Sequence, residues 1–360
     1  MQLTFQYGSR NGKEEKFMKK FVLAFLLMLT IGLTYGETIE LLGAGATFPA
    51  PLYTKMFDVY YKEMGVKVNY QAIGSGGGIQ QLISRTVDFG ATDAPMNEKE
   101  GKAAKGEVLH IPLCLGAVVI AYNLPGNPLL KLTPDVIADM FLGKIKKWSD
   151  KRIKDLNPDA KIPDLPVVVV HRSDGSGTTY TFSEYLSSVS EEWKSKVGTG
   201  KSLNWPTGIG GKGNPGVAGY VKQTPGAVGY VELAYAKQTK LMYAILQNKK
   251  GKFIEASLKS ISLAADVPMP EDMKVSIVNT ASPEGYPICT FSWVLAYKEQ
   301  SEGGRPASRV EALVKLLWWM AHEGQSYNEA LDYGSLPKTV VKIVEKQIES
   351  ITYEGKKVKK

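Results

Sequence analysis

The stretch from Val167 to Phe182 reads VVVVHRSDGSGTTYTF and combines a strand, a turn and the start of a helix. Four apolar β-branched residues predict a buried strand, and the residues from Thr178 to Tyr185 predict a helix start. The first N–H groups of a helix have no partner within it, and its amino end carries partial positive charge. The polar, glycine-rich turn between strand and helix is therefore a candidate binding site for an anion.

The side chains of this turn refine that expectation. Arg172 supplies one cation, and Ser176, Thr178 and Thr179 supply hydroxyl groups. Asp174 adds a carboxylate, which a site built only for negative charge would avoid. We therefore expect a pocket for an oxyanion, in which acidic groups indicate which oxyanion is bound.

Two other glycine-rich turns are expected between a strand and a helix, GAGATFP (Gly43–Pro49) and GSGGG (Gly74–Gly78). A single glycine-rich turn commonly reflects only the conformational freedom of glycine. Three such turns with neighbouring hydroxyls indicate more, since converging helix amino ends can hold a small tetrahedral anion without many cations.

Strands and helices alternate from Glu40 onward, which predicts an α/β fold with a largely parallel sheet. Asp93 lies just past the end of one expected strand, and Gly65 is expected to end the first helix. The other expected strands and helices follow in order along the chain: helix 49–61, strand 66–70, helix 79–83, strand 87–92, strand 108–122, helix 133–143, strand 287–297 and helix 308–320.

Length and composition indicate a globular protein of about two domains, with 360 residues, 44% hydrophobic and 22% charged. The formal net charge is +8, of which residues 1–36 contribute +3 from five Lys/Arg and two Glu, leaving +5 for the rest. No block of Lys and Arg interleaves with aromatic residues, so we expect no nucleic-acid partner.

The N-terminal segment resembles a secretory signal peptide. Lys19 and Lys20 precede the apolar run Phe21–Leu33, and Thr34-Tyr35-Gly36 resembles a cleavage site. The run is shorter than the roughly 20 residues that span a bilayer. We expect residues 1–36 to be a leader that starts at Met18. With no cysteine near the cleavage site, we expect an exported, soluble periplasmic protein without a lipid anchor.

Cysteine and histidine provide no metal or cofactor signature. Cys114 and Cys289 lie in similar apolar strand contexts, where either a disulfide or two buried thiols is consistent with the sequence. The three histidines are widely spaced, and no CxxC pair occurs.

Nucleotide-binding motifs are only partly matched. GTGKS (Gly198–Ser202) resembles the end of a P-loop, but Ser195 stands where that motif needs glycine. GAG at the start of the first turn resembles a dinucleotide fingerprint, but Phe48 occupies the third glycine position.

A serine hydrolase is the enzyme alternative. Ser75 and Ser176 lie in glycine-rich turns, but the pattern G-x-S-x-G fails at both because Ile73 and Asp174 occupy its first position. His171 is interpreted as a structural strand residue, since neighbouring strand residues point to opposite faces. We therefore expect no enzyme activity.

Five blocks of sequence carry a resemblance to a known family: GAGATFPAP (43–51), NYQAIGSGGG (69–78), VDFGATDAP (87–95), HRSDGSGTT (171–179) and QTPGAVGYVELAYA (223–236). The chain resembles the periplasmic phosphate-binding protein of the high-affinity phosphate ABC importer. That family has the type II periplasmic-binding-protein fold, an α/β architecture of two lobes. Each lobe has a central, mostly parallel sheet flanked by helices. The resemblance implies a first lobe of residues 37–122 plus 286–360 and a second of 123–285, joined by two crossover segments.

The resemblance also implies which residues bind phosphate. These residues fall in the three turns and after the strand that ends at Thr92: Thr47, Phe48, Ser75, Asp93, Arg172, Ser176, Gly177 and Thr178. Asp174 is expected to pair with Arg172. The family commonly has serine where this chain has Thr92 and Gly76, and neither position supplies a matched ligand group.

The expected function is binding of inorganic phosphate and its delivery to the permease subunits of an ABC importer, by a monomer. Phosphate keeps a proton at neutral pH, and the resemblance implies that Asp93 accepts a hydrogen bond from it. A site built to bond a ligand O–H rejects an analogue that lacks it by about 10⁴- to 10⁵-fold, which disfavours sulfate. The alternatives are a binder of another tetrahedral oxyanion and a phosphate-ester hydrolase.

Overall fold

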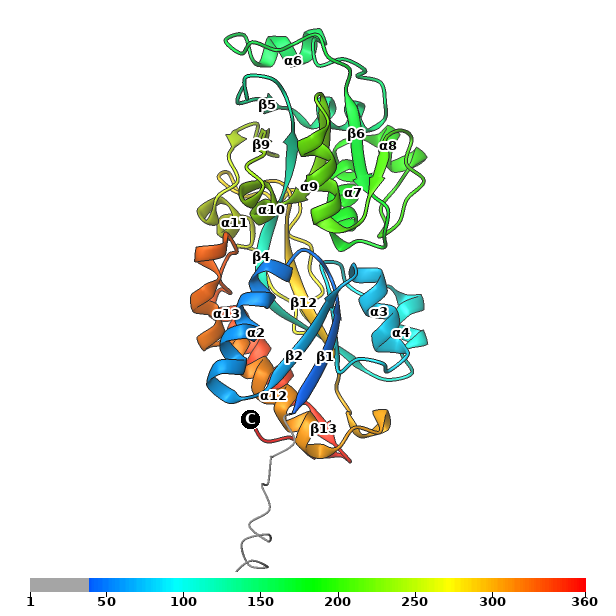
Figure 1. Cartoon of the computed structure of the whole chain (residues 1–360), viewed down its shortest axis with the longest axis vertical. Coiled ribbons are helices and arrows are strands. Elements are labelled where there is room, and N and C mark those ends of the chain that lie inside the picture. The colour runs from blue at the N-terminus through cyan, green and yellow to red at the C-terminus, as the bar shows by residue number, and fades with distance from the viewer. Residues whose placement is uncertain (1–38) are drawn as a thin grey trace, which may run out of the picture. The chain divides into compact units, whose positions relative to one another are not determined.

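A long buried strand, β4 (Val108–Tyr122), runs through the middle of the computed structural model, which describes residues 39–360 (Figure 1). Every residue of β4 except Val108 is buried. The strand predicted over residues 108–122 is therefore confirmed. The predicted leader and its start at Met18 lie outside the described residues.

The main sheet has nine strands, eight of them in the order β2-β1-β3-β12-β4-β8-β6-β7, with β9 paired to β4. Their bounds, in chain order, are as follows: β1 (Glu40–Gly45), β2 (Lys67–Ala72), β3 (Phe89–Thr92), β4, β6 (Val168–Arg172), β7 (Ile209–Gly211), β8 (Ala227–Glu232), β9 (Met242–Tyr243) and β12 (Cys289–Tyr297). Strand β12 pairs with the first part of β4 (residues 108–117), and β8 with its last part (118–122).

Strand direction differs between the flanks and the middle of this sheet. The pairs that β1 makes with β2 and β3 are parallel, as are those of β6 with β7 and β8. The pairs of β12 with β3 and β4, and of β4 with β8, are antiparallel. The α/β class is confirmed, and the sheet is mixed because β4 and β12 pass between two parallel sections.

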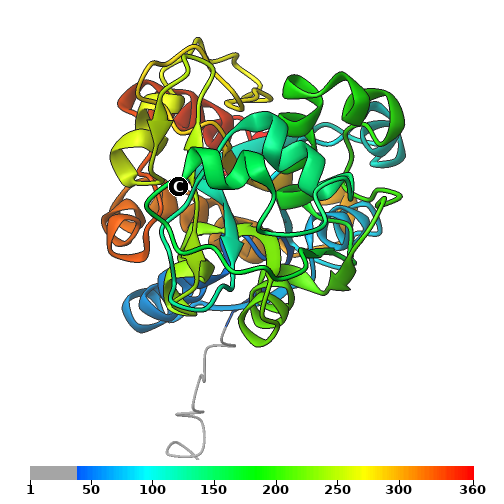
Figure 2. The same ribbon diagram turned by 90° about the horizontal axis from the view of Figure 1, so that it is seen from above.

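Helices cover the strands on two sides, as the view from above shows (Figure 2). Helices α12 and α13, near the C-terminus, lie in the same part of the molecule as α2 and β1 from the N-terminal part (Figure 1). The helix bounds are as follows: α2 (Ala50–Met64), α3 (Ser75–Ile83), α4 (Glu98–Ala103), α5 (Pro134–Phe141), α6 (Lys151–Leu156), α7 (Gly177–Val189), α8 (Glu191–Lys196), α9 (Gly213–Gln223), α10 (Leu233–Gln238), α11 (Leu258–Ala264), α12 (Ala307–Ala321) and α13 (Lys338–Glu349).

The remaining elements are short. Two small sheets and three 3-10 turns complete the described part of the chain: β5 (Lys131–Leu132), β10 (Ile245–Gln247) and β11 (Phe253–Ile254); β13 (Thr352–Tyr353) and β14 (Lys356–Lys357); and η1 (Ser301–Gly303), η2 (Glu323–Tyr327) and η3 (Glu329–Leu331).

The predicted elements match the observed ones within a few residues, with one correction. Gly65 ends α2 in the left-handed conformation, with φ 70°, as predicted. The second helix, predicted from Ile79, begins at Ser75, so the GSGGG segment forms its first turn and not a loop before it. Glycine disfavours helix by propensity, but Gly78 packs directly on β1: a Cβ there would lie 2.4 Å from Gly45 Cα. Tertiary packing therefore selects glycine in this helix.

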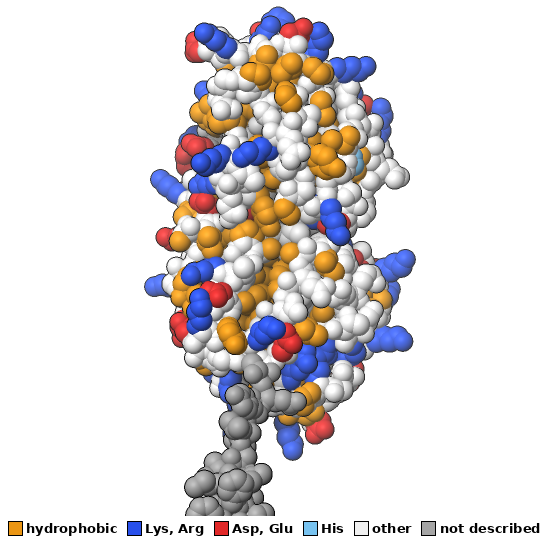
Figure 3. All heavy atoms as spheres, viewed as in Figure 1, with side chains coloured by type: hydrophobic (Ala, Val, Ile, Leu, Met, Phe, Trp, Pro, Cys, Tyr) orange, Lys and Arg blue, Asp and Glu red, His pale blue; other side chains and the backbone are white. Residues whose placement is uncertain are grey.

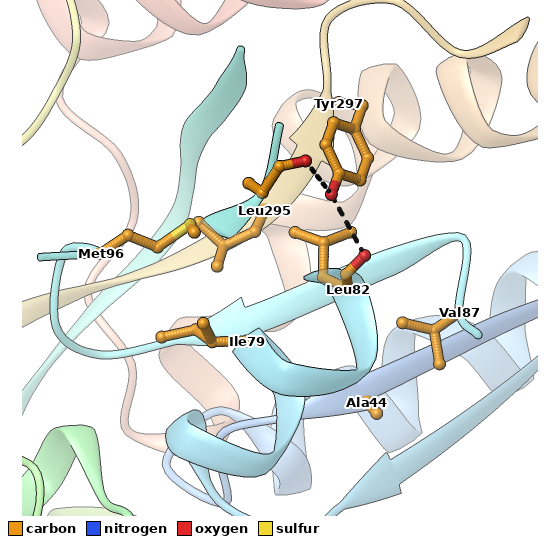
Figure 4. Packing of buried hydrophobic residues seen from close by; sticks show 8 residues of the cluster. Ala44, Ile79, Leu82, Val87, Met96, Leu295 and Tyr297 are labelled. Carbon is orange, nitrogen blue, oxygen red and sulfur yellow. Dashed lines mark hydrogen bonds between the residues drawn. The ribbon is translucent and has the colours of Figure 1, made fainter. Parts of the chain in front are cut away.

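A hydrophobic cluster anchors α3 to the sheet. Its buried members come from β1, α3, β12 and the connecting loops (Figure 4): Ala44, Ile79, Leu82, Val87, Met96, Ala104, Leu295 and Tyr297. The hydroxyl of Tyr297 donates to the carbonyl of Ala104 at 3.0 Å, so its polar end is satisfied within the cluster. This packing holds the amino end of α3 in place.

Cys114 and Cys289 are both buried free thiols. Their strands pair, but Cys114 lies opposite Ser292 and Cys289 opposite Ala117. The two cross-strand pairs lie three residues apart along the strands, which is about 10 Å at the rise of a β-strand. A disulfide needs Cα atoms within about 7 Å, so of the two alternatives the structure has the free thiols.

The surface mixes charges of both signs. Lys and Arg side chains are interspersed with Asp and Glu on the face drawn in Figure 3. Among residues 39–360, no helix combines the length and apolar character needed to cross a bilayer. In the same range, no group of three or more His, Cys, Asp and Glu side chains is arranged to hold a metal ion.

Candidate ligand-binding site

The three glycine-rich turns meet at one place. The N–H of Gly76 donates to the carbonyl of Gly175 at 2.8 Å, and the N–H of Gly177 donates to Ser75 Oγ at 3.0 Å. A Cβ on Gly177 would lie 2.7 Å from both Ser75 Oγ and Asp93 Cβ, so this approach requires glycine. The amino ends of α3 and α7 therefore face the same small volume, and the first N–H groups of each helix lack partners within that helix.

Arg172 and Asp174 form a two-bond ion pair beside these turns, as predicted. Arg172 Nε lies 2.7 Å from Asp174 Oδ1, and Nη2 lies 2.5 Å from Oδ2. The Gly213 N–H also donates to Asp174 Oδ1, at 2.9 Å. Burial alone would raise the pKa of Asp174, but the hydrogen bond and charge of Arg172 together with the Gly213 N–H lower it. Asp174 therefore stays ionised and offsets much of the guanidinium charge.

Asn214 connects the first turn to the third and was not predicted. Its side-chain amide donates to Thr47 Oγ1 at 3.0 Å and to Thr178 Oγ1 at 3.1 Å. Its backbone N–H also donates to Thr47 Oγ1, at 3.1 Å, and its Oδ1 accepts from the N–H of Glu232. Asn214 is fully buried in the first turn of α9. A polar residue inside the segment GGKGNPG was the available signal, but nothing in the sequence indicated its partners.

Asp93 lies at the end of β3, where it was predicted, and is only 2% exposed. Its Oδ1 accepts from Ser292 Oγ at 2.9 Å, and its N–H donates to Ser75 Oγ at 3.3 Å. Burial raises the pKa of Asp93 to about 7, although Ser292, Arg172 and Ser75 oppose the rise. In its ionised form this carboxyl group can accept a hydrogen bond from a protonated ligand.

Two tyrosine hydroxyls bind backbone carbonyls of the first glycine-rich turn. The ring of Phe48 is fully buried and packs edge-on against Tyr333, whose hydroxyl donates to the Phe48 carbonyl at 2.6 Å. The hydroxyl of Tyr235 donates to the Thr47 carbonyl at 2.6 Å in the same way. Two tyrosines that sequence reasoning missed thus hold the first turn.

Ser176 caps α7 with its side chain, which accepts from the N–H of Thr179 at 3.0 Å. The N–H of Ser176 donates to the Lys201 carbonyl at 2.8 Å. The N–H groups of Ser176 and Gly177, two of the predicted binding residues, therefore have partners within the protein, the Lys201 carbonyl and Ser75 Oγ. The hydroxyl of Thr178 accepts from Arg172 Nη1 at 3.4 Å.

The residues of the rejected motifs have structural partners. His171 stacks on Trp205, with 4.7 Å between ring centroids and 8° between planes, which fits a structural strand residue. Lys201, from the P-loop-like segment, pairs with Glu100 at 2.6 Å. Among the hydrogen bonds of residues 39–360, neither Ser75 nor Ser176 is bonded to a histidine. The arrangement therefore offers hydrogen-bond donors and an acceptor for an oxyanion.

Comparison with known proteins gives a consistent result. Residues 33–315 match the family model described as a PBP superfamily domain. The phosphate-binding protein PstS of Pasteurella multocida is 44% identical over 335 residues, covering 91% of this chain and 95% of that protein. The PstS protein of Methanocaldococcus jannaschii is 41% identical over 331 residues, covering 85% of each.

Solved structures show the same fold. A high-affinity periplasmic phosphate-binding protein (PfluDING) bound with phosphate aligns with a TM-score of 0.69 at 18% identity, covering 86% of this chain and 93% of that one. A phosphate-binding protein from Stenotrophomonas maltophilia aligns with a TM-score of 0.67 at 17% identity, covering 85% and 93%.

Proposed function

Because the chain belongs to the PBP superfamily, and within it to the family of PstS phosphate-binding proteins, we propose that it binds inorganic phosphate and delivers it to an ABC permease for import. The ligand lies where the three glycine-rich turns meet. The residues that bind it are those predicted from the sequence: Thr47, Phe48, Ser75, Asp93, Arg172, Ser176, Gly177 and Thr178. The N–H groups of Ser176 and Gly177 would exchange their partners within the protein, the Lys201 carbonyl and Ser75 Oγ, for the ligand.

The observation that carries this proposal is the buried carboxyl group of Asp93 among hydroxyl and amide groups. A fully deprotonated anion such as sulfate would place its lone pairs against those of this carboxylate. Phosphate at neutral pH still carries a proton and satisfies the carboxylate with a hydrogen bond. Leaving a buried acceptor unpaired is costly, so this arrangement favours phosphate over sulfate or molybdate.

The ion pair of Arg172 with Asp174 supports the same ligand. The guanidinium supplies positive charge, but Asp174 offsets much of it, so most of the binding energy comes from neutral donors. Such donors are directional and preorganised. Selection therefore depends on where the ligand carries its proton more than on its total charge.

We further propose that the chain forms two lobes that close on the ligand. Lobe I comprises residues 37–122 plus 286–360, and lobe II comprises residues 123–285. The hydrogen bond from Gly76 to Gly175 and the ion pair of Glu100 with Lys201 would join the two lobes in the closed form. Closure removes water and strengthens each electrostatic contact.

The setting we propose is the periplasm, reached through a leader in residues 1–36, with the protein acting as a soluble monomer. Its partners are phosphate and the transmembrane permease subunits, without nucleic acid and without enzyme activity. The alternatives are a binding protein for another tetrahedral oxyanion and a phosphate-ester hydrolase.

Calorimetric titration of the purified mature chain with phosphate, sulfate and arsenate tests the proposal. We expect tight binding of phosphate and at least about 10⁴-fold weaker binding of sulfate, the range for a site that requires a ligand O–H. Equal affinity for sulfate would overturn the phosphate assignment. Turnover of a chromogenic phosphate ester, lost in Asp93→Asn, would instead support the hydrolase.

A further inference from the structure

Ser292 lies directly against the carboxyl group of Asp93 and has no part in the phosphate contacts proposed above. All nine residues of β12 are buried, and Thr290 and Ser292 are two residues apart, so both hydroxyls emerge on the same face. Ser292 Oγ lies 2.9 Å from Asp93 Oδ1. Thr290 Oγ1 lies 3.2 Å from the main-chain carbonyl of Asp93. Of the two, only Ser292 contacts the carboxylate.

Ser292 lies at an irregularity in the pairing of β12 with β4. Ser292 pairs with Cys114, but the next residue, Trp293, pairs with Pro112, so β4 has one extra residue, Leu113, at this point. Such bulges change the direction in which a side chain points and occur next to functional sites. The register shift therefore lies beside Ser292, next to the point where Trp293 of β12 pairs with Thr92 at the end of β3.

The electrostatic surroundings of Asp93 make this hydroxyl important. Arg172 and Asp174 act on it from the end of β6 with opposite signs. Glu184 and Lys274, of opposite charge, line the same cavity as Asp93. Four further groups that act on it keep their protons because their pKa values are raised: Tyr53 on α2, Tyr70 on β2, Cys114 on β4 and Tyr235 on α10. Burial raises the pKa of Asp93, and three groups oppose this rise. The hydrogen bond from Ser292 lowers the pKa most, ahead of Arg172 and Ser75.

We propose that Ser292 is a positioning residue for ligand selection: its hydroxyl holds Asp93 Oδ1 and leaves Oδ2 as the acceptor for a protonated oxyanion. This inference rests on the proposed function, because it concerns the same site. Without the hydroxyl, Asp93 keeps its own proton to higher pH. A protonated acid donates a hydrogen bond, so it loses the preference for a ligand O–H and tolerates sulfate.

The test compares four proteins: wild type, Ser292→Ala, Ser292→Thr and Thr290→Val. Phosphate and sulfate affinities are measured by calorimetry between about pH 6 and 9. At the acid end of this range, we expect the phosphate affinity of Ser292→Ala to fall below that of wild type by about tenfold for each unit that the Asp93 pKa rises. At the alkaline end, we expect the two affinities to become equal again. The preference for phosphate over sulfate falls with it. Ser292→Thr retains the donor and should follow the wild type.

Thr290→Val is the matched control, since it removes a neighbouring hydroxyl that contacts the Asp93 main chain. We expect the same pH profile as wild type. A loss in Ser292→Ala that is constant across pH, or unchanged selectivity, would overturn the inference, because a packing defect does not depend on protonation. If Ser292→Ala fails to fold, Ser292→Cys keeps the volume with a weaker donor and should show the same trend at smaller size.

A ligand-free measurement separates this inference from the proposed function. The carboxyl stretch of Asp93 is followed by infrared titration, with Asp93→Asn subtracted to isolate the signal. Its midpoint should rise in Ser292→Ala relative to wild type and remain unchanged in Thr290→Val. An unmoved midpoint overturns the role of Ser292 even if phosphate binds, whereas a shifted midpoint without phosphate binding overturns only the ligand.

Discussion

The ammonium group of Lys201 lies 2.6 Å from the carboxylate of Glu100, 101 residues earlier in the chain. Only 12% and 15% of the two side chains are exposed. The same Glu100 oxygen accepts from the N–H of Asn97, which caps α4. The main-chain carbonyl of Lys201 accepts a hydrogen bond from the N–H of Ser176, at the amino end of α7. One lysine thus connects α4 to the turn that forms the candidate site.

Breaking this ion pair should speed phosphate release. We expect Lys201→Met and Glu100→Gln each to weaken phosphate binding by about 1 kcal/mol, since sheltered ion pairs contribute more than exposed ones. The double variant should lose little more than either single one, which calorimetry and stopped-flow dissociation would measure. Lys147→Met, which breaks the exposed pair with Asp164, is the control; a similar loss there would remove Lys201 from this role.

Replacing the acid should change selectivity more than affinity. We expect Asp93→Asn to retain measurable phosphate binding, while its preference for phosphate over sulfate falls by at least about tenfold, because an amide can donate to sulfate where a carboxylate cannot. Parallel titrations of both anions measure the ratio. An unchanged ratio would show that Asp93 does not select for the ligand proton.

The cation in the site should matter more than other basic residues. Arg172→Ala removes the guanidinium and leaves the half-buried Asp174 carboxylate without its two charged donors. We expect phosphate affinity to fall at least about tenfold, since a hydrogen bond to a charged group contributes about 1.5–3 kcal/mol. Lys360→Ala at the C-terminus, which contacts Glu349 and Trp318, should leave affinity unchanged; equal losses would contradict the assignment.

The pKa of Asp93 predicts how ligand-free stability depends on pH. Burial raises this pKa to about 7 from an ordinary value of 3.8, so the folded state holds the proton more tightly than the unfolded state. The contribution of Asp93 to the unfolding free energy is therefore largest below about pH 4 and falls by up to about 4 kcal/mol as pH rises to about 7.

Urea unfolding of wild type and Asp93→Asn at several pH values checks this sign. The stability of wild type relative to Asp93→Asn should decrease from acid to neutral pH and then level off. A difference that grows with pH over the same range would mean that the folded-state pKa is depressed and not raised.

The contact between α3 and β1 predicts opposite effects for two helical glycines. A Cβ at Gly78 would lie 2.4 Å from Gly45 Cα and 2.5 Å from the Ala44 carbonyl, which are backbone atoms. We expect Gly78→Ala to lower the unfolding free energy by about 1–3 kcal/mol, the usual cost of overpacking. Gly101→Ala in α4 meets nothing within 4 Å and should be neutral or stabilising by up to about 1 kcal/mol. Denaturant unfolding curves that rank the two variants the other way would contradict this packing.

The sequence alone predicted the class of fold and most of its elements. The strand over residues 108–122 and the helix ended by Gly65 were evident because continuous apolar runs, helical stripes and glycine caps are local signals. The turn from Arg172 to Thr178 indicated an oxyanion site for the same reason, since its charge, hydroxyls and helix start are neighbours in the chain. The other two glycine-rich turns were evident from the same pattern, and the resemblance to a family then indicated which of their residues bind the ligand.

Only the tertiary structure decided what completes the site and how its chemistry is tuned. Asn214 bridges Thr47 and Thr178 across separations of 167 and 36 residues, and Ser292 reaches Asp93 across 199. No local pattern encodes such pairings, because they depend on which strands become neighbours and in which register. The raised pKa of Asp93 is likewise a property of burial, which exists only once β3, β12 and α7 surround the carboxyl group. Residue type thus determined which groups are available, and packing determined their partners and their protonation.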